Sequence, residues 1–325
     1  MSSYTNLLEV NKLNTRINQE NFTIYPVSDF ELLLRQEEIV AILGESGCGK
    51  TMSALSITGL VPKSAKVIQG KIMLEGNILD PRNETQMEKI RGSKISYVFQ
   101  DATSYLNPIF TIGDQINEMV TIHQNLSQEQ RRSKVCSFLE LVDLKPADKF
   151  YWLYPHQLSG GMNQRAMIAM ALASNPKILI ADEPTSNLDR ITELKILKLL
   201  LDLKNKLKIS IIFITHNIST IENFADSIIV MYAGRIVEIG TKEEILSTSH
   251  HPYTKGLLNC IPKTSSKGNT IPTIKGNVPD LSSLPQGCKF HPRCPFVMPK
   301  CREKEPEFYK ISNTHYSKCY LQQKI

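Results

Sequence analysis

A glycine-rich segment with the sequence GESGCGKT occupies residues 44–51. It follows a short apolar run and precedes a helical pattern, and in that context this spacing predicts a phosphate-binding loop. The glycines let the backbone curl so that its N–H groups point at phosphate oxygens, and the helix N-terminus adds a positive partial charge. We therefore expect a nucleotide's phosphates to be bound by the eight residues of this loop: Gly44, Glu45, Ser46, Gly47, Cys48, Gly49, Lys50 and Thr51.

Three side chains of the loop have chemistry of their own. Lys50 would reach the terminal phosphates, and the hydroxyl of Thr51 would take one place on Mg²⁺. Cys48 is most simply a small filler, although its nearness to phosphate-binding N–H groups could make it reactive.

Two adjacent acids, Asp182 and Glu183, follow the apolar run 178–181. A buried strand fixes the point where its last side chains emerge, at the carboxyl edge of the sheet. We expect Asp182 to hold Mg²⁺, directly or through water, and Glu183 to polarise the attacking water as general base. A solvated acidic turn is the alternative interpretation.

Four further motifs follow the order found in one protein family. The segments are LSGGM at 158–162, Gln100 after Tyr-Val-Phe, SNLD at 186–189 and His216 after Ile-Thr. They resemble the signature, the Q-loop, the D-loop and the switch histidine of ABC ATPases. The resemblance implies head-to-tail dimers, in which ATP lies between one subunit's phosphate-binding loop and the other's signature.

The resemblance also implies a role for each residue. Gln100 would serve both catalysis and the Mg²⁺ site, and His216 would contact the γ-phosphate and sense its loss. Ser159 and the N–H groups of Gly160 and Gly161 would donate hydrogen bonds to phosphate on the partner subunit. ATP binding would close the dimer, and hydrolysis would let it reopen.

Two positions depart from the family pattern. The residue aligned with the aromatic that stacks on adenine is Ile17, so Phe22 or Tyr25 would have to substitute for it. Met162 replaces the commoner glutamine of the signature, and in this it resembles one subgroup of peptide importers.

The elements that position these motifs are short apolar runs alternating with helical patterns, which predict an α/β fold with a parallel sheet covered on both faces. The resemblance makes this the core of a P-loop NTPase, with an N-terminal antiparallel β part and a helical subdomain inserted at about 103–160. We expect an ABC ATPase domain over 1–260 and a small cysteine-rich extension over 261–325, with a linker or arm at 262–285.

Four of the seven cysteines lie near the C-terminus, at Cys288, Cys294, Cys301 and Cys319. A cytosolic chain should not rely on disulfides, so the group predicts a metal or cluster site. It resembles the C-terminal motif of oligopeptide and dipeptide importer ATPases, and in some of these relatives the four cysteines carry a [4Fe–4S] cluster. Tetrahedral Zn²⁺ and no metal at all are the alternatives. His291 and His315 are predicted to be structural, not ligands.

Two more segments narrow the class of transporter. FQDATSYLNP at 99–108 resembles the stretch after the Q-loop in peptide and nickel importers, and HPYTKGLL at 251–258 resembles their tail. The resemblance therefore implies a subunit that hydrolyses ATP to ADP and phosphate to power oligopeptide or dipeptide import. Nickel or metal-chelate import is the alternative. A soluble ABC ATPase of DNA repair or translation usually has tandem cores or a long coiled coil, and this chain has neither.

Composition and charge indicate the partners. Hydrophobic residues make up 41% and charged residues 22% of the 325, and the net charge of +6 forms no block of the kind a nucleic-acid binder has. No apolar run approaches the roughly 18 to 20 residues of a membrane span, and we see no secretory signal. We expect a peripheral protein on the cytoplasmic face of the cell membrane. The implied partners are a second, related ATPase in a heterodimer, two transmembrane permease subunits and an extracytoplasmic substrate-binding protein.

Overall fold

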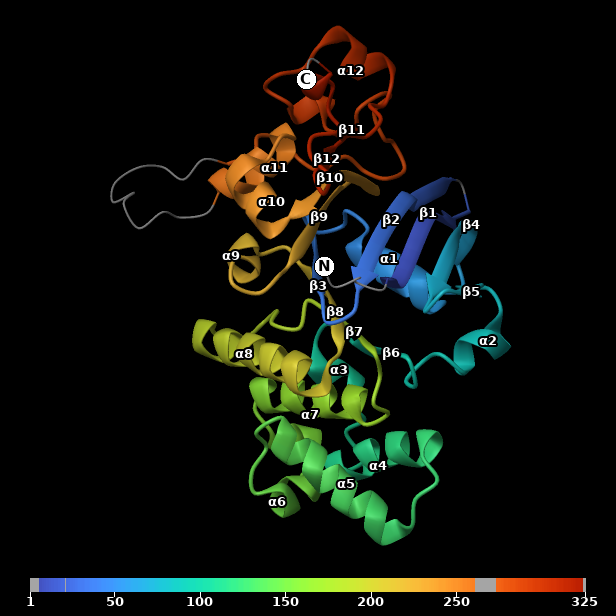
Figure 1. The fold of residues 1–325 in the computed structure, drawn as a ribbon, viewed down its shortest axis with the longest axis vertical. Helices are drawn as coiled ribbons and strands as arrows, with labels where there is room; N and C mark the ends of the chain where they lie inside the picture. The colour runs from blue at the N-terminus through green and yellow to red at the C-terminus, as the bar shows by residue number, and fades with distance from the viewer. Residues whose placement is uncertain (1–5, 21, 261–272, 324–325) are drawn as a thin grey trace. The chain divides into compact units, whose positions relative to one another are not determined.

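The structure, a computed structural model, describes residues 6–20, 22–260 and 273–323 (Figure 1). The chain forms two compact units, one of residues 1–83 and 215–325 and the other of residues 84–214.

The predicted boundary between the ATPase domain and the C-terminal extension falls at residue 261, outside the described residues, as does the first part of the arm predicted over 262–285. The division of the chain into 1–260 and 261–325 stays a prediction.

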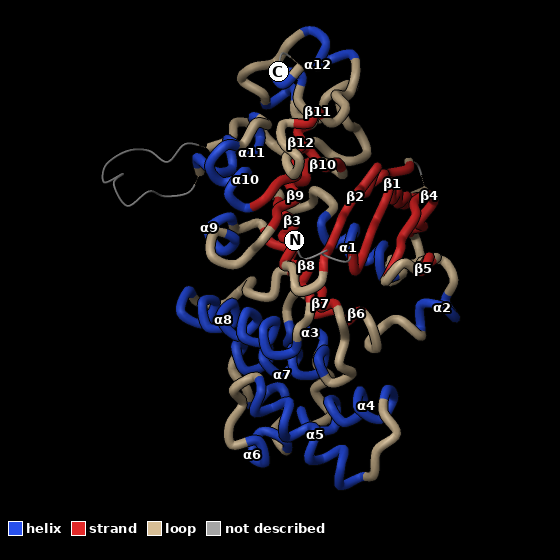
Figure 2. Tube along the Cα trace, in the orientation of Figure 1, coloured by secondary structure: helices blue, strands red, loops and turns tan. Residues whose placement is uncertain are grey.

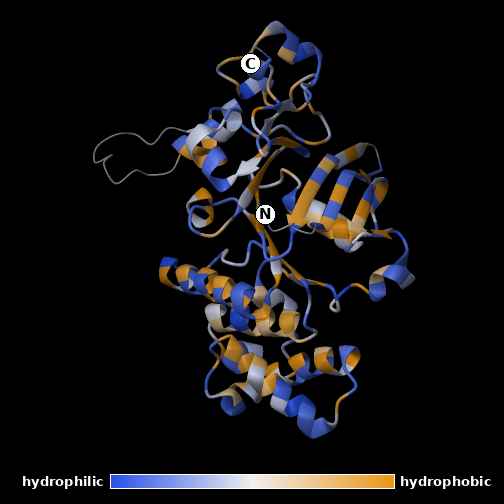
Figure 3. Ribbon diagram, viewed as in Figure 1, coloured by the Kyte–Doolittle hydropathy of each residue, from blue (hydrophilic) through white to orange (hydrophobic). Residues whose placement is uncertain are grey.

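An antiparallel sheet in the first unit has the strand order β2-β1-β4-β5. Its strands are β1 (Asn6–Asn18), β2 (Thr23–Arg35), β4 (Ala65–Leu74) and β5 (Asn77–Leu79). Hydropathy alternates along these strands, as the colours of Figure 3 show, which is typical of a sheet with one covered face. Helix α1 (Lys50–Thr58) packs against β1 and β2, with the hydroxyls of Thr15 and Ser56 2.6 Å apart. This sheet confirms the predicted N-terminal antiparallel part.

Five more strands of the first unit lie in the order β11-β12-β10-β9-β3. They are β3 (Ile39–Leu43), β9 (Ser227–Tyr232), β10 (Arg235–Thr241), β11 (Tyr309–Lys310) and β12 (Tyr316–Ser317). β3 and β9 run parallel, and β3 is buried along its whole length, as a strand covered on both faces should be. β10 is antiparallel to β9, and β12 and β11 continue the sheet beyond β10. The C-terminal segment is therefore hydrogen-bonded to the sheet that carries the glycine-rich loop.

Short helices accompany these strands. They are α9 (Ile218–Ile221), α10 (Lys242–Thr248), α11 (Pro252–Asn259) and α12 (Pro299–Glu303), with 3₁₀ turns η2 (His291–Arg293) and η3 (Tyr320–Gln322). Helix α10 begins at a capping box, in which Thr241 and Glu244 satisfy each other's backbone N–H groups.

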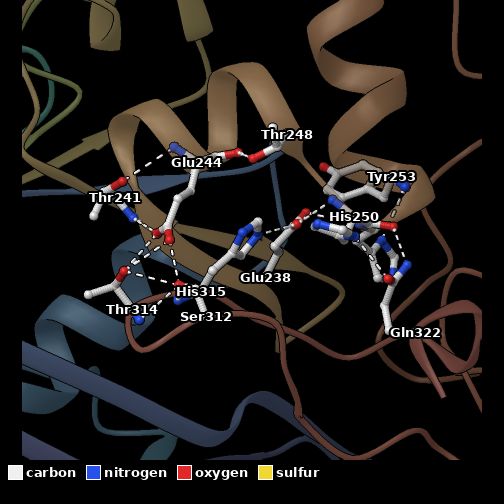
Figure 4. Close-up of polar contacts among 11 residues, drawn as sticks. Glu238, Thr241, Glu244, Thr248, His250, Tyr253, Ser312, Thr314, His315 and Gln322 are labelled. Atoms are coloured by element: carbon white, nitrogen blue, oxygen red, sulfur yellow. Dashed lines mark hydrogen bonds and ion pairs between the residues drawn. The ribbon is translucent and has the colours of Figure 1, made fainter. Parts of the chain in front are cut away.

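A buried polar network centred on Glu238 of β10 anchors the C-terminal segment (Figure 4). Glu238 is fully buried and accepts a hydrogen bond from Nε2 of His315 at 2.8 Å. The backbone N–H groups of His250 and His251 donate to the same carboxylate, at 2.6 and 3.1 Å. This contact gives His315 a structural role between β10 and the segment that leads into β12.

Replacing Glu238 by alanine should lower the free energy of unfolding by about 3 kcal/mol, because three donors, two of them in buried hydrogen bonds, lose the carboxylate that accepts from them. Glu238→Gln keeps one acceptor oxygen and should cost about half as much. Denaturant unfolding of the purified chain measures both effects. The exposed Glu243 supplies the control, since Glu243→Ala should change stability by less than about 0.5 kcal/mol. A loss as small as this in Glu238→Ala would show that the network does not anchor the segment.

The second unit contains three parallel strands in the order β8-β7-β6. They are β6 (Ile95–Val98), β7 (Ile178–Asp182) and β8 (Ser210–Thr215), and all residues of β7 and β8 are buried. Helices α7 (Gly160–Leu172) and α8 (Arg190–Leu207) precede and follow β7. The predicted alternation of strands and helices is present here.

Between β6 and α7 the chain is mainly helical, as predicted for about 103–160 (Figure 2). The helices here are α3 (Ala102–Tyr105), α4 (Ile112–His123), α5 (Gln128–Leu141), α6 (Ala147–Tyr151) and the 3₁₀ turn η1 (Pro155–Gln157), and α2 (Glu84–Glu88) lies before β6. Caps divide the stretch, because Thr111 caps α4 and Ser127 forms a capping box with Gln130 at the start of α5. None of the described helices has the length and apolar character that crossing a membrane requires.

Candidate nucleotide-binding and hydrolysis site

The glycine-rich loop lies where its sequence predicted, between β3 and the start of α1. Gly49 caps the helix at φ +103°, and a Cβ there would lie 2.1 Å from the carbonyl oxygen of Pro26. At Gly44 a Cβ would lie 2.4 Å from the carbonyl oxygen of Met231. Neither position has room for a side chain, so glycine is needed at both for the loop's backbone to lie this close to its neighbours.

Lys50 is buried and folds back over its own loop. Its Nζ donates to the carbonyl oxygens of Gly44 at 2.9 Å and Glu45 at 3.1 Å. The ammonium group therefore already lies among the loop's backbone groups, where an entering phosphate would meet it. Thr51, the next residue, has an exposed side chain.

Cys48 is fully buried, and burial raises the pKa of its thiol to about 11 despite the opposing charge of Lys50. A thiol with this pKa is protonated at neutral pH and is a poor nucleophile. The filler interpretation of Cys48 is therefore favoured over the reactive one.

The two predicted acids lie at the end of β7. Asp182 is buried, and its carboxylate accepts a hydrogen bond from the hydroxyl of Tyr97 at 2.8 Å. Burial, together with the charge of Asp182, raises the pKa of Tyr97, so this hydroxyl stays a donor. The position of the Asp182 carboxylate is thus fixed from the neighbouring strand β6.

Glu183 adopts a left-handed backbone conformation with φ 43°, which is uncommon for a residue with a side chain. Its backbone N–H donates to the carbonyl oxygen of Ile214 on β8 at 3.0 Å. Nε2 of Gln100 donates to its carboxylate at 3.3 Å. The structure therefore brings Gln100 and Glu183 together. Asp182, the last residue of β7, directly precedes Glu183 in the chain.

The signature residues start helix α7. Ser159 is the N-cap, and its Oγ accepts from the backbone N–H of Met162 at 3.4 Å. Ser159 and Gly160 are exposed and Gly161 is partly buried, so this 13-residue helix begins at the surface. An exposed helix N-terminus of this kind suits a phosphate supplied by another subunit. At Gly161 a Cβ would lie 2.5 Å from Cγ2 of Thr192 on α8.

The remaining motifs are on exposed turns. Asp189 of the D-loop caps α8 and accepts from the backbone N–H groups of Ile191 and Thr192, both at 3.0 Å. His216 follows β8 directly and has an exposed side chain.

A family model described as "ABC transporter" matches residues 27–186, and one described as "Oligopeptide/dipeptide transporter, C-terminal region" matches residues 237–301. The oligopeptide transport ATP-binding protein AppD of Bacillus subtilis is 41% identical over 97% of this chain and 96% of its own length. The chain belongs to the ABC transporter family. It is an ATP-binding subunit of the kind that hydrolyses ATP.

Further relatives of this ABC ATPase agree. The dipeptide transport ATP-binding protein DppD of Escherichia coli is 38% identical over 97% of the chain and 96% of its own length. Among solved structures, the dimeric ATP-binding cassette MJ0796, in a post-hydrolysis state with ADP and Pi, aligns with a TM-score of 0.65 and 29% identity. That alignment covers 72% of this chain and 98% of the cassette. It confirms the predicted ABC ATPase fold, and the cysteine-rich extension stays a prediction.

One residue beside the candidate site was missed in the sequence, namely Tyr97, whose hydroxyl donates to Asp182. The signal was its position three residues before Gln100 on an apolar strand, but its partner lies 85 residues away. The residue that stacks on adenine stays a prediction. Phe22 and Tyr25 are exposed to 43% and 42%, so both rings have surface to offer, and Ile17 is partly buried.

Proposed function

We propose that this chain is one of two ATPase subunits that power an importer of oligopeptides or dipeptides. The observation that carries the proposal is similarity over nearly the whole chain, including residues 237–301, to ATP-binding proteins of peptide transport. ATP hydrolysis supplies the energy, and the substrate is selected by other subunits.

Each catalytic side chain has a proposed task. Glu183 is the general base: its carboxylate, held by the Gln100 amide, takes a proton from the attacking water. Asp182, oriented by Tyr97, binds Mg²⁺ together with Thr51 and Gln100.

The phosphates have donors of their own. Lys50 and the backbone N–H groups of residues 44–51 bind the β- and γ-phosphates, and His216 contacts the γ-phosphate. Ser159, Gly160 and Gly161 serve the nucleotide of the second ATPase subunit in a heterodimer, and the exposure of Ser159 and Gly160 supports this role.

Exposed apolar side chains in the helical part support contact with permease subunits. Ile109, Phe110 and Trp152 are exposed to 73%, 50% and 56%. The backbone N–H of Ile112 donates to the carbonyl oxygen of Leu153 at 2.8 Å, which brings the two segments together. Apolar surface of this kind marks a contact site. We propose that two transmembrane permease subunits dock on this part of the two ATPase subunits at the cytoplasmic face, with a substrate-binding protein on the other side of the membrane.

Purified complex in proteoliposomes tests the substrate. Peptide-loaded binding protein should stimulate ATP hydrolysis several-fold, and nickel or nickel chelate should not. The segment 99–108 resembles that of nickel importers as well as peptide importers, so stimulation by nickel alone would move the protein to that second candidate function.

The four C-terminal cysteines are proposed to hold a [4Fe–4S] cluster. One pocket is lined by all four of them, Cys288, Cys294, Cys301 and Cys319. In the described part of the chain, no three His, Cys, Asp or Glu side chains are arranged to hold a single metal ion. Four thiolates are the donor set that a [4Fe–4S] cluster requires, and a single tetrahedral Zn²⁺ on the same four sulfurs is the alternative.

Backbone geometry supports the pocket. The backbone N–H of Cys288 donates to the carbonyl oxygen of Cys301 at 2.8 Å. Gly287 permits this approach, because its φ is +68° and a Cβ would lie 2.3 Å from that oxygen. Burial raises the pKa of Cys288 to about 12 and that of Cys319 to about 11, and repulsion from the other cysteines adds to both. When bound, the cluster would stabilise four thiolates and staple a segment that has little core of its own.

Cys294→Ser should reduce the iron content of anaerobically purified protein from about four atoms per chain to less than one. The visible absorption of the cluster should disappear with the iron. Cys136→Ser, on helix α5 and outside the pocket, is the control and should keep both signals. Equal iron in the two variants would exclude Cys294 as a ligand, and one zinc atom per chain in the wild type would favour the Zn²⁺ alternative.

A further inference from the structure

An ion pair joins the cysteine-bearing segment to the glycine-rich loop. Arg293, in turn η2 just before Cys294, donates from Nη1 and Nη2 to the two carboxylate oxygens of Glu45, at 2.8 and 3.0 Å. The two residues are 248 positions apart in sequence. The Arg293 side chain is only 5% exposed and that of Glu45 is 28% exposed. A bidentate contact this well buried fixes the orientation of the Glu45 side chain.

Arg293 is itself held in place on several sides. Its Nε donates to the carbonyl oxygen of Lys275 at 3.0 Å, and its Nη1 lies 3.4 Å from the hydroxyl of Tyr232. The guanidinium carbon lies 5.7 Å from the ring centre of Tyr232 and 6.0 Å from that of Phe290. Because these contacts hold the guanidinium from several sides, it can act as a fixed support for the loop.

The same region also holds the backbone of residue 45. The N–H of Glu45 donates to the hydroxyl of Tyr253 on α11 at 3.0 Å. Tyr253 is fully buried and packs edge-on against Tyr232, with ring centres 4.7 Å apart. Arg293 therefore binds the side chain of Glu45, and Tyr253 accepts a hydrogen bond from its main chain.

Glu45 is the one acidic residue within the loop of residues 44–51, which must bind a polyanion. If the Glu45 carboxylate were unpaired, its negative charge would repel a phosphate bound by the same loop. Its backbone carbonyl also accepts a hydrogen bond from Nζ of Lys50, at 3.1 Å. A continuous set of contacts thus leads from Arg293 through Glu45 to the ammonium group that receives the phosphates.

We propose that Arg293 is a positioning residue for the phosphate-binding loop: it neutralises and fixes Glu45, so that the C-terminal cysteine-bearing segment sets the affinity for ATP. This rests on the proposed role of residues 44–51 in binding ATP. Arg293 does not touch the nucleotide in this account, and its effect is on ATP affinity, not on turnover by nucleotide-saturated enzyme.

A double-mutant cycle tests the proposal. Binding of the non-hydrolysable analogue AMP-PNP with Mg²⁺ is measured on the purified full-length chain as wild type, Arg293→Gln, Glu45→Gln and the double variant. Arg293→Gln should weaken binding about ten-fold when Glu45 is present, because a repelling carboxylate is uncovered. In the Glu45→Gln background the same substitution should change affinity less than about two-fold, because the charge is absent.

Two further measurements separate positioning from a merely structural role. In the assembled complex Arg293→Gln should raise KM for ATP about ten-fold with little change in kcat. Arg293→Lys keeps the positive charge but loses the bidentate geometry of the guanidinium, so it should recover part of the affinity. It also provides a conservative variant that should fold. An equal ten-fold loss in both Glu45 backgrounds, or a lower melting temperature with unchanged affinity, would overturn the proposal.

Lys50→Ala serves as the reference variant in this experiment. If Lys50→Ala weakens AMP-PNP binding and Arg293→Gln does not, only the role of Arg293 is wrong. If Lys50→Ala has no effect either, the assignment of the loop fails, and the inference drawn from it fails too.

Discussion

Glu183→Gln should lower the rate of ATP hydrolysis by the assembled complex about 10³-fold while ATP still binds. Glutamine has the shape of glutamate, but its amide cannot take a proton from water. The unusual backbone at Glu183 and its N–H contact to Ile214 do not depend on the carboxylate, so the local structure should persist. The loss therefore reports the chemistry and not the fold.

Phosphate release measures the turnover of this variant, and retention of ATP on the complex measures its binding. Glu88→Gln, an exposed glutamate on helix α2, is the matched control and should hydrolyse ATP like the wild type. Normal turnover by Glu183→Gln would show that another group activates the water.

Lys50→Ala should weaken the binding of AMP-PNP with Mg²⁺ on the order of 100-fold, or about 2.7 kcal/mol. Two effects add here. The phosphates lose a charged hydrogen-bond donor, and the carbonyl groups of Gly44 and Glu45 lose the ammonium that holds them. The loop is then less well ordered before the nucleotide enters.

The control for this variant is Lys63→Ala, since Lys63 is an exposed lysine shortly after helix α1. Its affinity should be that of the wild type. If Lys50→Ala bound the analogue as tightly as the control, phosphate binding would have to be assigned to other groups.

Local patterns in the sequence were enough to predict the loop and the strand-end acids. Residues 44–51 follow one strand and open one helix, so their geometry depends on neighbours a few positions away. The same holds for Asp182 and Glu183 at the end of β7. Each motif is informative because its function requires a fixed local backbone.

Contacts between distant segments could not be predicted in this way. Tyr97 holds Asp182 from another strand, and Arg293 reaches Glu45 across 248 positions. The sequence around Arg293 does not indicate Glu45 as its partner. The nearby Cys288 and Cys294 pointed to a metal or cluster site instead. Strands β11 and β12 are each two residues long and too short to show an alternating pattern. Such features depend on tertiary pairing, for which the local sequence has no signal.

The most direct test of the proposed function is uptake of a labelled peptide by cells from which only this protein has been removed, with nickel uptake measured alongside. We predict that peptide uptake is lost and nickel uptake is normal. Adding back the wild-type chain should restore peptide uptake, and adding back Glu183→Gln should not. Normal peptide uptake with loss of nickel uptake would contradict the proposed substrate, and full rescue by Glu183→Gln would contradict the proposal that hydrolysis by this subunit drives transport.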